Sequence, residues 1–176
     1  MARTSIISFI AITAGIGSAL AAGAGLENHA PYGDTITSLT TDEVASHATA
    51  SFLRADANSD GFVNVDEYAA LTIVTAELSL LNGFIALQTG SAEEKVELPF
   101  GNPGALTRGE RARIEAVARS EFYQIAGDDS TISHSEFHDH KASKFAEADR
   151  NRNGKLAKAE LQAFAAAEAN VTYSGV

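Results

Sequence analysis

The stretch that decides the fold is residues 56–67, which read Asp-Ala-Asn-Ser-Asp-Gly-Phe-Val-Asn-Val-Asp-Glu. Oxygen-bearing side chains stand at positions 1, 3, 5, 9 and 12 of this stretch, and a glycine stands at position 6. A calcium ion takes about 6 to 8 oxygen ligands, and a loop with this spacing supplies them in chain order around a glycine turn. We therefore predict a calcium site in which Phe62 contributes its backbone carbonyl and five residues contribute side chains, namely Asp56, Asn58, Asp60, Asn64 (directly or through water) and Glu67.

A second copy of this pattern occupies residues 149–160, Asp-Arg-Asn-Arg-Asn-Gly-Lys-Leu-Ala-Lys-Ala-Glu. Its predicted ligands are Asp149, Asn151, Asn153, the backbone carbonyl of Lys155, and Glu160. Only two of these carry a formal negative charge, against three in the first loop, and basic side chains surround them. Because affinity falls with ligand charge, we expect a weaker site, the alternative being a folded loop that is mostly empty at low calcium.

A third, degenerate copy lies at residues 125–136. It keeps the apolar Ile132 at position 8 and Glu136 at position 12, but Ile125 and Gly127 occupy positions 1 and 3, so two side-chain ligands are missing. We interpret it as a loop without metal whose Ile132 pairs with position 8 of a working loop. The sequence leaves open whether the first loop pairs with the loop that starts at 125 or the one that starts at 149.

The remaining pattern predicts an all-α domain of helix-loop-helix units with two well-formed loops and one degenerate loop. Capping boxes at Thr40 with Glu43 and at Thr107 with Glu110 mark two helix starts. The two later loops are separated by a stretch with room for one shared helix only. We expect a signal peptide over 1–21, a flexible leader over 22–39 and a domain over 40–172, comprising a hand at 41–81, a linker at 82–106, a degenerate hand at 107–148 and a hand at 134–169.

The amino terminus has the features of a secretory signal peptide. Arg3 precedes a charge-free stretch, residues 4–26, which contains the small-residue motif Ala19-Leu20-Ala21. We predict cleavage after Ala21 and a periplasmic or secreted protein with no membrane association after cleavage; an uncleaved membrane anchor is the alternative.

Composition narrows the classes of function. The chain has 13 basic and 23 acidic side chains, a net charge of −10, and no cysteine. An acidic surface repels nucleic acid and attracts cations, so we expect no nucleic-acid partner and calcium ions as ligands. The lack of cysteine excludes a disulfide scaffold and thiolate-ligated zinc or iron–sulfur sites.

On these loops the chain resembles the EF-hand superfamily over about residues 40–169. More narrowly it resembles exported bacterial EF-hand proteins in which neighbouring loops share one short helix, the compressed spacing found in lanmodulin-like proteins. The lanthanide binding of that group would be implied only if the loops matched more closely. They lack its proline at position 2, where Ala57 and Arg150 stand, and they carry Asn58, Asn151 and Asn153 in place of carboxylates. We therefore expect calcium, with a lanthanide ranked below it.

Two further features leave alternatives open. His134 and His138 are spaced to chelate zinc, copper or nickel, although solvated histidines are the interpretation we favour. The sequence contains no catalytic constellation, so we predict no enzyme.

The apolar run 69–87 has apolar residues on more than one face of its expected helix, and Leu78 and Leu81 belong to one of these faces. Packing in the core or on the linker is favoured, and a calcium-controlled surface that docks an exported protein partner, as in a sensor, is the alternative.

Overall fold

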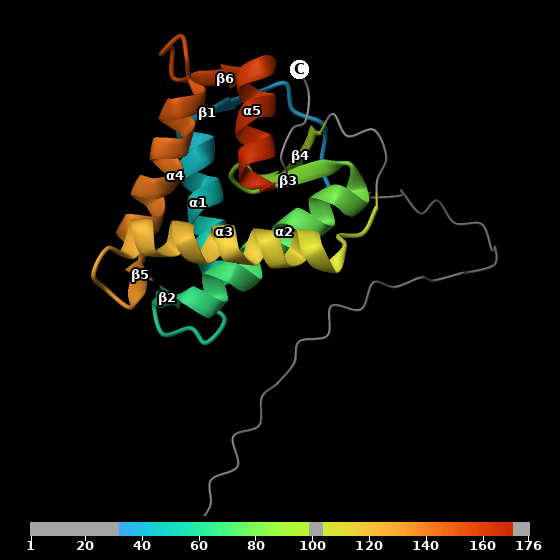
Figure 1. Ribbon diagram of the computed structural model, residues 1–176. Coiled ribbons are helices and arrows are strands. Elements are labelled where there is room, and N and C mark those ends of the chain that lie inside the picture. The colour runs from blue at the N-terminus through green and yellow to red at the C-terminus, as the bar shows by residue number, and fades with distance from the viewer. Residues whose placement is uncertain (1–31, 99–103, 171–176) are drawn as a thin grey trace, which may run out of the picture.

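The computed structural model describes residues 32–98 and 104–170. The predicted signal peptide and the first part of the predicted leader lie outside these residues. The described part is mostly helical rather than purely α, because short strands join the helices. Its helices are α1 (Thr41–Ala55), α2 (Val65–Asn82), α3 (Arg108–Ala126), α4 (His134–Ala148) and α5 (Ala159–Glu168), arranged as in Figure 1.

Side-chain caps define where the helices begin. Before α1 the Thr40 backbone N–H donates to Glu43 Oε2 at 2.7 Å, and before α3 the Thr107 N–H donates to Glu110 Oε2 at 2.8 Å, as the capping boxes predicted. These bonds satisfy backbone groups that a helix start leaves unpaired. The end of α2 is also determined by a local feature: Gly83 adopts φ +75°, a left-handed conformation that favours glycine.

Short antiparallel strands join the loops in pairs. In the first pair, β2 (Phe62–Asn64) lies against β5 (Thr131–Ser133), so the loop at 56–67 is paired with the degenerate loop. In the second, β1 (Ser38–Thr40) lies against β6 (Lys155–Ala157). The end of the predicted flexible leader is therefore ordered, because its backbone completes the strand pairing of the last loop.

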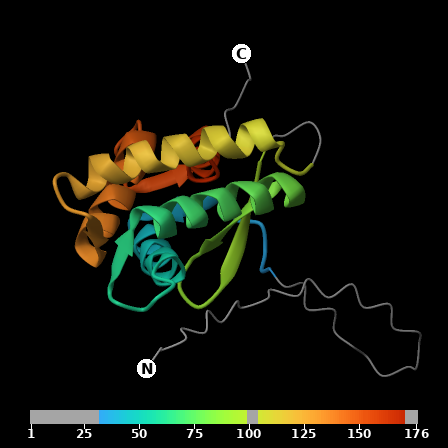
Figure 2. The same cartoon turned by 60° about the horizontal axis from the view of Figure 1, so that its bottom comes forward.

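The expected linker over 82–106 also contains regular structure. Strands β3 (Phe84–Gln88) and β4 (Glu93–Glu97) form a hairpin that extends from the end of α2 (Figure 2). Alternate residues of β3, Ile85 and Leu87, are buried, which is the period of a strand with one covered face. The chain before β1 joins this hairpin, since the Gly33 N–H donates to the Glu93 carbonyl at 2.7 Å.

The architecture repeats with an offset of 93 residues along the sequence. Leu39 and Thr40 before α1 correspond to Ile132 and Ser133 before α4, and the glutamates that cap these two helices also correspond. Each repeat therefore consists of three parts: a short strand with few metal-ligand residues (β5 or β1, the ligand-poor strand), the helix that follows it (α4 or α1, the shared helix), and the loop after that helix that carries the predicted ligands (149–160 or 56–67, the ligand-rich loop). The shared helices α1 and α4 pack on each other, and each ligand-rich loop pairs with the ligand-poor strand of the other repeat.

The core is divided into two apolar clusters, one behind each strand pair. The cluster behind β2 and β5 contains Phe52, Tyr68, Phe122 and Phe137, among others. The cluster behind β1 and β6 is built around Phe145 and Phe164 and includes the buried face of the β3–β4 hairpin. Helices α2 and α3 lie side by side over the first cluster (Figure 2). None of the helices within 32–98 and 104–170 has the length and hydropathy needed to cross a bilayer.

Candidate metal centre

The first candidate site is the loop between α1 and α2. Asp56, at position 1, is largely buried, and both of its carboxylate oxygens accept loop N–H groups: Oδ1 that of Asp60 at 3.0 Å and Oδ2 that of Gly61 at 3.0 Å. Gly61 has φ +85°, so the turn that presents its N–H is one that a residue with a Cβ resists. The carboxylate at position 1 thus orders the loop around itself.

Other predicted ligands of this loop are also hydrogen-bonded to its backbone. Asn58 Oδ1 accepts the Asp60 N–H at 2.8 Å, and Asp60 Oδ1 accepts the Phe62 N–H at 2.9 Å. From the first turn of α2, Glu67 reaches back across the loop to accept the N–H of Asn58 at 3.3 Å and that of Asn64 at 3.0 Å. An all-oxygen set in which position 12 spans the loop fits a hard cation such as calcium.

The loop between α4 and α5 has the same framework. Asp149 accepts the Asn153 N–H at 3.1 Å and the Gly154 N–H at 2.8 Å, and Asn153 Oδ1 accepts the Lys155 N–H at 2.8 Å. Glu160 Oε1 accepts the Asn151 N–H at 3.3 Å. Each bond has its counterpart 93 residues earlier, so the second loop has the same hydrogen-bond framework as the first.

The two loops differ at position 9. In the first, Asn64 Oδ1 caps α2 by accepting the N–H groups of Asp66 at 3.0 Å and Glu67 at 3.1 Å. In the second, position 9 is Ala157, and α5 begins without a side-chain cap after Lys158, which has φ +51°. Position 12 therefore sits on a less well-anchored helix start, and one oxygen ligand is missing.

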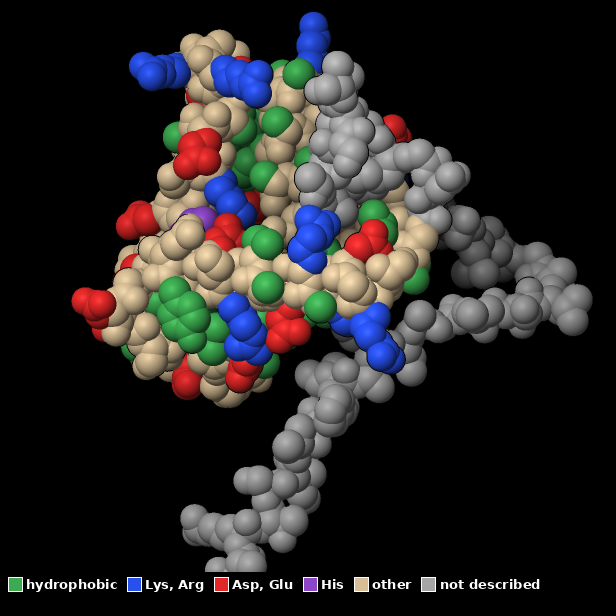
Figure 3. Space-filling view, in the orientation of Figure 1, with side chains coloured by type: hydrophobic (Ala, Val, Ile, Leu, Met, Phe, Trp, Pro, Cys, Tyr) green, Lys and Arg blue, Asp and Glu red, His purple; other side chains and the backbone are tan. Residues whose placement is uncertain are grey.

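Charge also separates the two loops. Basic side chains gather around the loop that joins α4 to β6, at the top of Figure 3; its sequence contributes Arg150, Arg152, Lys155 and Lys158. The first loop contains no basic residue. Fixed positive charge near a cation site lowers its affinity, more so at low ionic strength.

The loops rely on more than carboxylates. Within 32–98 and 104–170, no three His, Cys, Asp or Glu side chains are already gathered as a set able to hold a metal ion. In both loops the carboxylates accept loop N–H groups, and amide and main-chain oxygens would have to complete a donor set for calcium. We therefore expect Glu67 and Glu160 to close further onto an ion when it binds.

Each ligand-rich loop is held by an apolar contact with its ligand-poor partner. Val63 lies opposite Ile132, and Leu156 lies opposite Leu39, and all four side chains are fully buried. The degenerate loop thus pairs with a ligand-rich loop as predicted, and its partner, which the sequence left open, is the first loop. The partner of the second loop was not predicted. The available signal was the Leu39-Thr40-x-x-Glu43 pattern, which matches positions 8, 9 and 12 of a loop.

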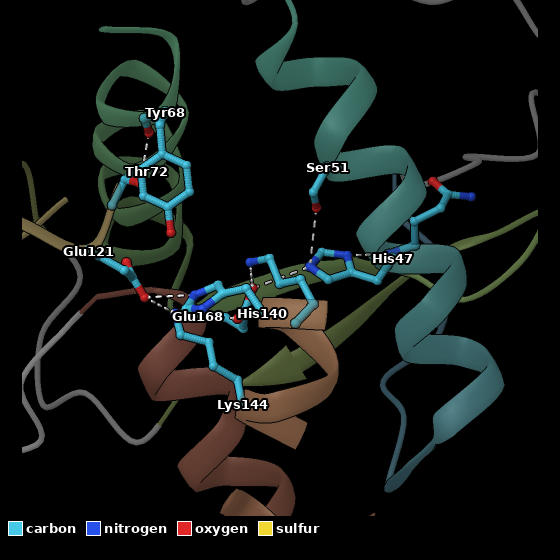
Figure 4. A network of polar contacts seen from close by, with 10 residues as sticks. His47, Ser51, Tyr68, Thr72, Glu121, His140, Lys144 and Glu168 are labelled. Carbon is cyan, nitrogen blue, oxygen red and sulfur yellow. Dashed lines mark hydrogen bonds and ion pairs between the residues drawn. The ribbon is translucent and has the colours of Figure 1, made fainter. Parts of the chain in front are cut away.

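Figure 4 shows a buried ionic cluster around Glu168, Lys144, Glu121 and His140. Glu168 of α5 is buried and pairs with Lys141. Its second oxygen, which has no hydrogen-bond partner, is 3.7 Å from Lys144 Nζ. Lys144 in turn binds Glu121 at 2.8 Å, and His140 Nε2 lies 2.9 Å from the same carboxylate. The cluster joins α3, α4 and α5.

Burial and pairing act in opposite directions on these carboxyls. Burial favours the neutral form of Glu168, but Lys141 and Lys144 outweigh it and hold the pKa of Glu168 well below its usual value. Burial likewise opposes ionisation of Glu121, while His140 and Lys144 lower its pKa to about 2. Lys141 continues the apolar stripe of Phe137 and Phe145 on α4, which is the one sequence signal that could have predicted a buried lysine.

Comparison with protein families matches the EF hand family at two segments, residues 49–72 and 143–165. These segments contain the two ligand-rich loops with parts of their flanking helices. Comparisons with curated proteins and with solved structures found no match. Sequence match and loop geometry agree that the chain contains an EF-hand domain with two EF-hand motifs.

Proposed function

We propose that this protein is an exported calcium binder with two unequal sites, a stronger one at residues 56–67 and a weaker one at 149–160. The observation that carries the proposal is the hydrogen-bond framework that the two loops share, in which the position-12 glutamate reaches back across the loop. The missing ligand at Ala157 and the surrounding basic charge support the lower affinity of the second site. Calcium at about 100 times its dissociation constant would stabilise the folded form by about 2.7 kcal/mol.

Export is part of this proposal and rests on the amino-terminal sequence. The charge-free stretch after Arg3 and the Ala-Leu-Ala motif support a cleaved signal peptide and a periplasmic or secreted location. Extracellular fluids and the periplasm offer more calcium than the cytosol, so sites with few charged ligands can still fill there. Expression of the full chain followed by fractionation and amino-terminal sequencing tests this part; a product that retains residues 1–21 would contradict it.

An exposed apolar stripe on α2 supports a second candidate function, a calcium-dependent interaction module. The outer side of α2 exposes Val74, Leu78 and Leu81, each 47% accessible, while the opposite side buries Ala76 and Ser79. This differs from the favoured expectation that the apolar run packs entirely in the core or on the linker. If calcium controls this stripe, binding of a hydrophobic dye should differ between calcium and chelator, and Leu78→Glu should remove the difference.

We propose no enzymatic activity. Within the described ranges, Ser51, His47 and Glu168 form a Ser–His–Glu contact, but hydroxyl and carboxylate approach the same nitrogen: His47 Nε2 is 3.4 Å from Ser51 Oγ and 3.6 Å from Glu168 Oε2. His47 Nδ1 accepts the Gln88 N–H at 3.3 Å. A hydrolytic triad needs the two partners on opposite ring nitrogens, so this contact is structural.

The direct test is calorimetric titration of the metal-stripped protein with calcium and, in a separate run, with lanthanum. The proposal predicts two calcium binding events of different affinity and a modest gain with lanthanum, because the loops have few carboxylates. A lanthanum affinity higher by many orders of magnitude would favour the lanthanide alternative. Absence of heat with both ions would overturn metal binding altogether.

A further inference from the structure

Two histidines on α4 form a pair that the calcium loops do not use. His134 and His138 are one turn apart on the helix, and their ring centroids are 4.4 Å apart with an interplanar angle of 36°. The His134 ring also contacts Phe52 of α1 edge to face, at 5.0 Å between centroids. The pair therefore lies at the interface between α1 and α4, with the two rings in contact.

A hydrogen bond from α1 determines which nitrogen of His138 is available. Thr49 Oγ1 lies 3.1 Å from the Ala45 carbonyl oxygen, to which its hydroxyl can donate, and 3.0 Å from His138 Nε2. When the single hydroxyl hydrogen is used on Ala45, Thr49 Oγ1 accepts from His138; His138 Nε2 then carries the proton, and Nδ1 keeps its lone pair. An imidazole that donates one N–H to an oxygen while presenting the other nitrogen is the usual arrangement of a metal-ligating histidine.

We propose that His134 and His138 chelate a divalent transition-metal ion, with water completing its coordination and with Thr49 as the positioning residue for His138. Imidazole ligands suit Cu²⁺, Ni²⁺ and Zn²⁺, whereas oxygen loops suit calcium, so the two kinds of site select different ions. Affinity should follow the general order for such ligands, with Cu²⁺ bound more tightly than Ni²⁺ or Zn²⁺ and Mn²⁺ bound least.

The third histidine of α4 provides a matched control. His140 lies on the same helix but its Nε2 is 2.9 Å from Glu121 Oε1, away from the pair. His140→Gln changes the histidine content of α4 equally and should leave metal binding by the pair intact. Thr49→Val removes the acceptor for His138 Nε2–H, and Thr49→Ser restores it.

The experiment is titration of the full chain with Ni²⁺ in saturating calcium, which keeps the loops filled. We expect one Ni²⁺ site that weakens at least tenfold in His134→Gln and in His138→Gln, is unchanged in His140→Gln, and weakens in Thr49→Val with recovery in Thr49→Ser. The electron paramagnetic resonance spectrum of bound Cu²⁺ should show two nitrogen ligands in the wild type and one in either single variant. No Ni²⁺ binding, equal binding in His138→Gln, or equal loss in His140→Gln would each overturn the proposal; circular dichroism verifies that every variant is folded.

Discussion

Glu168→Gln is the substitution whose energetic effect follows most directly from the buried ionic cluster. The glutamate side chain is only 3% exposed, and its charge is balanced by Lys141 and Lys144. Glutamine keeps the volume but leaves Lys141, itself buried, without a counter-charge; Lys144 still has Glu121. Breaking one side of a buried ion pair costs roughly 3 to 5 kcal/mol. For a chain of this size that corresponds to a midpoint lower by roughly 6 to 20 °C.

The assay is urea and thermal unfolding followed by circular dichroism in excess calcium, so that both loops remain filled. The double variant Lys141→Met with Glu168→Leu is the control, because an apolar pair of similar volume is often neutral or stabilising at such positions. It should recover most of the stability lost in Glu168→Gln. A Glu168→Gln cost below about 1 kcal/mol, or a double variant as unstable as the single, would refute the claim that an unpaired buried charge is the cause.

The same carboxyl predicts a pH dependence. The pKa of Glu168 is lowered in the folded protein, so its contribution to stability is complete above the ordinary value of 4.5 and is lost as pH falls through the lowered folded pKa. The wild type should therefore lose stability below about pH 4.5 more steeply than Glu168→Gln. Parallel curves for the two proteins would contradict this assignment.

Three further predictions concern the loops. Ile132→Ala should destabilise the fold by about 2 to 5 kcal/mol and weaken calcium binding at the first loop, whereas Leu39→Ala should weaken the second; titration calorimetry that finds the effects reversed would refute the observed pairing. Gly61→Ala meets no neighbouring atom but forces a Cβ into φ +85°, so it should cost about 1 to 2 kcal/mol in urea unfolding, and an unchanged midpoint would show that the turn relaxes. Ala157→Asn restores the missing ligand and cap residue of the second loop and should tighten its calcium affinity; a weaker or equal affinity would show that Lys158 backbone strain, and not the ligand, limits this site.

Local signals predicted the helices and ligand loops well. The capping boxes at Thr40 and Thr107 gave correct helix starts, because these motifs act within one turn of backbone. The inward orientation of Asp56 and Glu67 likewise follows from hydrogen bonds inside twelve residues. These parts of the site could be derived from spacing alone.

Long-range pairing could not be derived in the same way. The strand at Ser38–Thr40 is only three residues long, and its partner β6 is more than a hundred residues away, so the Leu39-Thr40-x-x-Glu43 pattern alone does not show which segment it pairs with. The β3–β4 hairpin was not predicted, because Phe84–Leu87 continues the apolar composition of α2 and only Gly83 separates the strand from the helix. The ionic partner of Lys141, Glu168, could not be predicted from the sequence either, because it lies on a different helix, α5.

The central claim, two EF-hand calcium sites of unequal strength, is tested most directly by calcium titration of Glu67→Gln and Glu160→Gln beside the wild type. The two substitutions remove the same ligand position from loops that share one hydrogen-bond framework, so each serves as the control for the other. We predict that Glu67→Gln abolishes the stronger binding event and that Glu160→Gln abolishes only the weaker. Loss of the stronger event in Glu160→Gln, or an unchanged titration in both variants, would contradict the account.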